Sequence, residues 1–91
     1  MRFRLEGENR AAGTGTGSSS TIEEASEVRW YSDAATGTNY TITVTKSDNT
    51  VIGSIRVNGT DSGIIVKNPT DKIYASNANV LLSPVNTRVR T

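Results

Sequence analysis

From residue 26 onward, short runs of alternating apolar and polar residues are separated by clusters of turn-forming residues. The runs recur at intervals of roughly 8–12 residues, the spacing that strands have in small β-sandwiches and barrels. The clearest run covers residues 39–46, where Tyr40, Ile42 and Val44 alternate with threonines and therefore share one face of a strand. The pattern predicts an all-β fold: a small antiparallel β-sandwich or barrel of about six to seven short strands.

The chain divides into three parts. Residues 1–6 alternate charged and apolar side chains and form an N-terminal arm strand. Residues 7–25 are rich in Gly, Ser and Thr, which predicts a flexible linker with room for one short helical turn at residues 20–26. Residues 26–91 form the β-sandwich domain, which ends in a basic tail.

The predicted core is small. A domain of about 60 residues buries only about 60% of its unfolded surface, and this chain has no cysteine for a disulfide. We therefore expect it to gain stability by association with copies of itself or with a larger scaffold. The positions predicted to face inward are Val28, Trp30, Tyr40, Ile42, Val44, Val51, Ile55, Val57, Ile64, Val66, Ile73, Ala75, Val80, Leu82 and Val85.

Both ends of the chain combine an apolar face with arginines on the opposite face. An alternating strand on a linker can add to the sheet of a neighbouring chain, which we favour, or fold back onto its own domain. Arginine and tyrosine on the outer face of the strand at residues 27–31 are a second candidate contact, because both residue types are enriched at protein interfaces. The candidate interface residues are Arg2, Phe3, Arg4, Leu5, Arg29, Tyr31, Arg88 and Arg90.

The composition gives little support for catalysis. The chain contains no Cys and no His, which excludes thiol nucleophiles, imidazole bases and zinc fingers. Its aspartates fall at predicted turns, where a carboxylate commonly bonds the local backbone, and the Gly-rich stretch at residues 13–17 lacks the Gly-Lys-Ser/Thr ending of a phosphate-binding loop. We expect no enzyme activity, no cofactor and no metal.

The charge and hydropathy patterns also limit the partners. A net charge of +1 provides no basic stripe for nucleic acid, and no apolar run reaches the ~20 residues that cross a membrane. The first residues lack the apolar segment of a signal peptide, so we expect the chain not to be secreted.

Trp30 has two interpretations. Beside Arg29 and Tyr31, it could stack on a sugar or a nucleobase. Its phase with Val28 instead favours a core position. A carbohydrate- or cell-surface-binding module, with Trp30, Tyr31, Tyr40 or Tyr74 as stacking residues, therefore remains an alternative function.

Three segments resemble a known group of proteins: Val28-Arg29-Trp30-Tyr31, Ile52-Gly53-Ser54 and the stretch from Val66 to Ala75, which contains Lys67-Asn68-Pro69-Thr70-Asp71. Together with Leu82-Ser83-Pro84-Val85, they are similar to small uncharacterised virion structural proteins of tailed bacteriophages, of the marine cyanophage type. The resemblance covers roughly residues 26–86 and brings no catalytic residues with it.

This resemblance implies a structural role in a virion assembled in the host cytoplasm. Its leading form is a capsid decoration or cement protein that binds the shell in many copies. A neck, collar or tail ring component is the alternative. The implied partners are copies of the chain itself, as a homo-oligomer, and other virion proteins such as the major capsid protein.

Overall fold

The computed structural model describes residues 4–33 and 37–86. The described residues form no α-helix; the one helical element is the 3-10 turn η1 (Thr16–Ser18). The strands are β1 (Arg4–Leu5), β2 (Arg10–Ala11), β3 (Glu27–Ser32), β4 (Asn39–Thr45), β5 (Val51–Asn58), β6 (Ser62–Val66), β7 (Lys72–Ala75) and β8 (Val80–Asn86).

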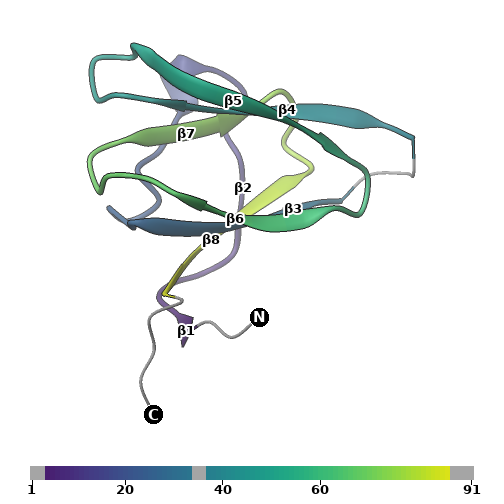
Figure 1. Ribbon diagram of the computed structural model, residues 1–91, viewed down its shortest axis with the longest axis horizontal. Helices are drawn as coiled ribbons and strands as arrows, with labels where there is room; N and C mark the ends of the chain where they lie inside the picture. Colours follow the sequence, from purple (N-terminus) through teal and green to yellow (C-terminus); the bar gives the residue numbers. More distant parts are fainter. Residues whose placement is uncertain (1–3, 34–36, 87–91) are drawn as a thin grey trace.

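The strands form two antiparallel sheets (Figure 1). In the larger sheet the order is β1-β8-β3-β6, and β2 also pairs with β8. In the smaller sheet the order is β5-β4-β7. The prediction of an all-β antiparallel sandwich is confirmed, and β2 is a strand that the sequence pattern did not indicate.

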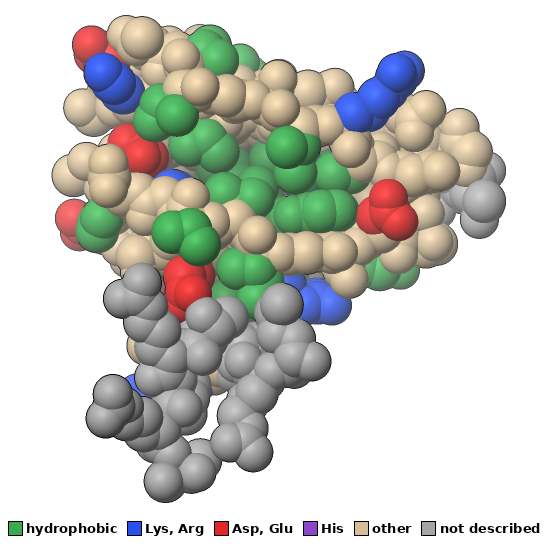
Figure 2. Space-filling view, viewed as in Figure 1, with side chains coloured by type: hydrophobic (Ala, Val, Ile, Leu, Met, Phe, Trp, Pro, Cys, Tyr) green, Lys and Arg blue, Asp and Glu red, His purple; other side chains and the backbone are tan. Residues whose placement is uncertain are grey.

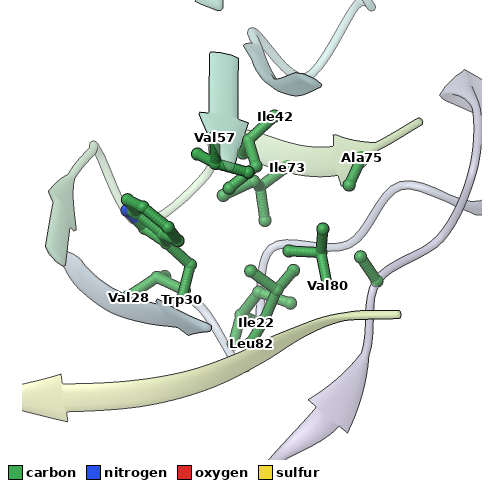
Figure 3. Close-up of a cluster of buried hydrophobic side chains, with 10 residues drawn as sticks. Ile22, Val28, Trp30, Ile42, Val57, Ile73, Ala75, Val80 and Leu82 are labelled. Atoms are coloured by element: carbon green, nitrogen blue, oxygen red, sulfur yellow. The ribbon is translucent and has the colours of Figure 1, made fainter. Parts of the chain in front are cut away.

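The core lies between the sheets (Figure 3). The larger sheet contributes Val28, Trp30 and Leu82, and the smaller sheet contributes Ile42 and Ile73. Trp30 is only 9% exposed, which confirms its predicted core position. On β4, Ile42 is buried and Tyr40 and Val44 pack partly buried against the core, as predicted, but Thr43 and Thr45 on the opposite face are buried as well.

Three residues predicted to face inward are exposed instead: Val51, Ile55 and Val66. On β6 the reason is register. Val28 pairs with Ile65 and Arg29 pairs with Ile64, so Ile65 faces inward, and Ile64, which was also predicted to face inward, lies on the outer face. On β5 only Val57 is buried, because no strand covers the rest of its inner face.

The segment predicted to be a flexible linker is docked on the sandwich from Arg10 onward. The Ala12 amide donates to the Val80 carbonyl (2.8 Å), and the Ala75 amide donates to the Gly13 carbonyl (2.9 Å). The backbone of Ser20 is bridged to that of Ile73. This segment therefore joins the free edge of β8 to the free edge of β7 and closes one side of the sandwich. Its Gly, Ser and Thr residues can do so because backbone groups pair without large side chains.

The predicted turn near residues 20–26 exists, but it is left-handed. Ile22, Glu23 and Glu24 have φ of 52°, 57° and 58°, a conformation that L-residues rarely adopt in succession. The Ala25 amide closes the turn on the Ile22 carbonyl (3.1 Å). It places the Ile22 side chain, which is 1% exposed, in the core.

Candidate interface between β5 and β6

The sandwich is open on the side opposite the docked N-terminal segment. Among the described residues, β5 pairs only with β4 and β6 pairs only with β3, so each strand has one free edge. The two strands follow each other in the chain and are joined by a turn in which Asp61 Oδ2 accepts from the Asn58 amide (3.0 Å). Beyond that turn they separate, and a groove lies between their free edges.

The groove is apolar and has a volume of about 280 Å³. Ile42, Val44 and Ile65 belong to its lining from the core side. Exposed side chains of both edge strands, Ile52, Ile55 and Val66, complete its apolar walls. Figure 2 shows the resulting continuous hydrophobic area in the middle of this face.

One end of the groove is polar, because Lys67 and Asp71 also line it. Lys67 is only 6% exposed, and its Nζ donates to the Asn68 carbonyl (3.3 Å). Burial lowers the pKa of Lys67, while the negative charges of Asp71 and Glu24 partly oppose this shift. Asp71 accepts from the Asn68 amide (3.0 Å), so both charged groups also hold the turn that follows β6.

The predicted interface residues lie elsewhere. Arg4 and Leu5 are exposed on β1, where they pair with Asn86 and Val85 of their own chain. Arg29 and Tyr31 are half-buried on β3 and face away from Val28 and Trp30. The structure thus places none of the described candidates in the groove. Arg2, Phe3, Arg88 and Arg90 lie outside the described residues.

Strand register nevertheless places three of the predicted interface residues, Leu5, Arg29 and Tyr31, on one face of the larger sheet. Arg29 pairs with Ser83, and Val85, two residues further along β8, pairs with Leu5. Because side chains alternate between faces, Leu5 lies on the same face of the larger sheet as Arg29 and Tyr31.

The sequence pattern does not predict the groove, because it predicts Val51, Ile55 and Val66 in the core. One signal could have revealed it. Val51, Ile52 and Ile55 place large apolar side chains on both faces of a single strand, which is unusual for a strand with one solvated face.

The aspartates behave as predicted at three turns. Asp48, Asp61 and Asp71 each accept a hydrogen bond from a backbone amide two or three residues away. Bonding to Thr50 lowers the pKa of Asp48. Within residues 4–33 and 37–86, no group of three or more Asp or Glu side chains is placed to hold a metal ion.

Comparisons with known proteins return nothing: no family model, curated protein or solved structure matches the chain. In the part of the chain that the structure describes, no helix is long and apolar enough to cross a membrane.

Proposed function

We propose that this protein is a structural component of a larger assembly and acts by protein–protein contact. The observation that carries the proposal is the distribution of exposed apolar side chains. Of the five large exposed ones among the described residues, Val51, Ile52, Ile55 and Val66 lie on the two edge strands beside the groove. Small soluble domains rarely leave such a patch exposed unless it binds something.

The edges themselves support the same function. Natural edge strands are usually short or carry lysine or proline, which prevents unwanted pairing. β5 spans eight residues, contains neither lysine nor proline, and is exposed over its first six positions. Its protective features are the single charge of Arg56 and the irregular pairing with β4 at Val44/Thr45. An edge this open is suited to pairing with another chain.

The setting that we propose is a bacteriophage virion, with the protein as a capsid decoration component. This part of the proposal rests on the sequence resemblance. It agrees with a β-sandwich that carries an apolar groove between two open strand edges, and the core position of Trp30 removes one residue from the carbohydrate-binding alternative.

The assembly function is tested with purified full-length chain and light scattering during gel filtration, over a hundredfold range of concentration. The key variant is Val66→Lys, because Val66 is 73% exposed and can be replaced without disturbing the core. Asn79→Lys, at an exposed position in another turn, is the matched control. We expect wild-type and Asn79→Lys chains to associate with themselves or with isolated capsids, and Val66→Lys to lose that association. A monomer that binds no virion protein contradicts the proposal.

The virion setting is tested by quantitative mass spectrometry of purified particles. Hundreds of copies per particle support decoration, whereas six or twelve indicate a neck or tail ring. Absence of the chain from virions contradicts the setting.

A further inference from the structure

The groove needs an occupant that is narrow, extended and apolar on one face. Strands within a sheet lie 4.7–4.9 Å apart, and packed sheets lie about 10 Å apart. Two facing edges of a sandwich therefore leave room for about one additional strand. A volume of 280 Å³ is small for a drug-sized ligand, for which pockets run to roughly 300–1,000 Å³. It suits a few side chains of such a strand.

The chain itself contains a segment with that pattern. Residues 2–6 alternate, with Phe3 and Leu5 on one face and Arg2, Arg4 and Glu6 on the other. Leu5 is 68% exposed, and it is the one large exposed apolar side chain among the described residues that does not lie beside the groove. The unpartnered apolar groups of the described chain thus fall in two places, the arm and the groove.

The arm is held weakly in its own chain. β1 contributes two residues to the sheet, both of them exposed. The Arg4 Nε–Glu6 Oε2 separation of 4.0 Å is at the limit of an ion pair, and both side chains are exposed. The Glu6 amide also donates to the Pro84 carbonyl (2.9 Å), so the arm is attached by a short stretch of backbone pairing, while the side chains of residues 4–6 are all exposed.

The arm cannot reach the groove of its own chain. Arg10 is fixed on β8, and β8, β3 and β6 lie between β2 and the groove. Four strand spacings amount to about 19 Å, whereas the five residues from Arg10 back to Leu5 span at most about 18 Å, so Leu5 falls short of the groove. The closed side of the sandwich, formed by the docked segment after β2, gives no shorter route.

We propose that the groove between β5 and β6 accepts the N-terminal arm, residues 2–6, of a second copy of this chain as an added β-strand. Phe3 and Leu5 enter the groove, the arginines face solvent, and the backbone of the arm pairs with the free edges of β5 and β6. This inference rests on the proposed assembly function and names the partner of that same groove. The contact joins two different surfaces, so each copy still has a free groove or a free arm for the next copy.

Cysteine cross-linking between copies provides the test, because the chain has no cysteine of its own. Full-length Leu5→Cys is mixed with full-length Val66→Cys or Ile52→Cys, one position on each edge strand, and one chain of each pair carries a mass tag. Disulfides form only where Cα atoms approach to about 4.4–6.8 Å. We expect the tagged heterodimer to form at least fivefold faster with a groove cysteine than with Asn79→Cys, the control. Leu5→Ser should weaken self-association by about tenfold or more, because it removes one apolar side chain from the contact.

The outcomes separate the inference from the proposed function. Association without preferential Leu5–groove cross-linking overturns the arm as occupant and leaves the assembly function in place. Preferential cross-linking from Val89→Cys overturns the inference in favour of the C-terminal segment. A chain that is monomeric alone but binds capsids through Val66 also overturns the inference and not the function. A monomer that binds nothing overturns both.

Discussion

Gly63 on β6 lies against the indole of Trp30, its partner on β3. A Cβ at this position would approach Trp30 Cζ2 to 2.9 Å and Nε1 to 3.1 Å. Glycine in a strand is otherwise unfavourable, because it supplies no side chain to pack. Here the Trp30 indole packs over Gly63, and the absence of a Cβ at Gly63 leaves the space that the indole occupies.

Gly63→Ala should therefore lower the free energy of unfolding by about 1–3 kcal/mol through overpacking against Trp30. The matched control is Gly53→Ala on β5, where a new Cβ meets nothing within 4 Å. We expect that control to be neutral or slightly stabilising. Urea denaturation followed by Trp30 fluorescence measures both, and equal stability of the two variants would show that the indole does not occupy this site.

Because Lys67 is buried, the free energy of unfolding of this protein should depend on pH. Burial lowers the pKa of its ammonium below the ordinary 10.5, so between the two values the unfolded chain binds more protons than the folded chain. The free energy of unfolding should consequently rise with pH over that interval, and the burial penalty is fully present below it. Asp71 and Glu24 are the negatively charged groups that oppose this lowering of the Lys67 pKa.

The measurement is urea denaturation of wild type and Lys67→Met from pH 7 to pH 10.5. The difference in unfolding free energy between the two proteins should change with pH in favour of the wild type. Lys46→Met, at an exposed turn position, is the control and should parallel the wild type. A constant difference between wild type and Lys67→Met would contradict the prediction.

At the scale of elements, the N-terminal segment is part of the fold. Ile22 reaches the core only because residues 22–24 adopt a left-handed turn. Two local side chains support it, since Ser20 Oγ accepts from the Ile22 amide (3.0 Å) and Thr21 Oγ1 accepts from the Glu24 amide (3.2 Å). Arg10 and Glu23 add an ion pair (2.5 Å) between β2 and the turn.

Ile22→Ala should accordingly destabilise the protein by about 2–5 kcal/mol, the range typical of buried isoleucine. An isoleucine in a detached linker would cost less than about 0.5 kcal/mol on the same substitution. Ile52→Ala, at a half-exposed position on β5, is the matched control and should have a small effect on the monomer. Thermal unfolding at low protein concentration distinguishes these results.

The strands that were predicted correctly from the sequence are those whose apolar side chains alternate regularly. The alternation in β4 fixes its inner face, and the phase of Val28 with Trp30 fixes that of β3. The inner face of β6 could not be predicted from three consecutive β-branched residues, because its register depends on the Trp30–Gly63 pair. The docked segment was missed since its contacts are mostly backbone hydrogen bonds, which leave no hydrophobic period.

The candidate site was less predictable than the fold. Exposure of Val51, Ile55 and Val66 depends on which strands are neighbours, and nothing local to β5 or β6 specifies that no strand lies between them. The strand at Arg4 and Leu5 was predicted from the sequence alone, because alternation next to a Gly-rich stretch is a local pattern, whereas the interface role of these residues stays a prediction.

For the whole molecule, the two sides of the sandwich should differ in local stability. β3, β4 and β8 pair on both edges, whereas β5 and β6 each have a free edge. Hydrogen exchange should therefore be slow in β3, β4 and β8 and fast at the free-edge amides of β5 and β6. At higher protein concentration those edge amides should become protected. Uniform protection across both sheets, or no change with concentration, would contradict an edge that pairs with another chain.

The pairing of β2 with β8 also determines when this protein can become folded during its synthesis. Arg10 and Ala11 are synthesised before their partners Leu82 and Leu81, which follow them in the chain by 70 residues or more. Until β8 is made, Ile22 and the inward side chains of β7 lack the β8 residues against which they pack. Strand pairing over such long sequence separations is also slow. Before β8 is made, the open edges of β5 and β6 and the apolar side chains of the unfinished core are therefore exposed at the same time. Partly folded chains with exposed apolar surface and unpaired strand edges are prone to aggregate, so this protein should be most vulnerable to misassembly before β8 is made.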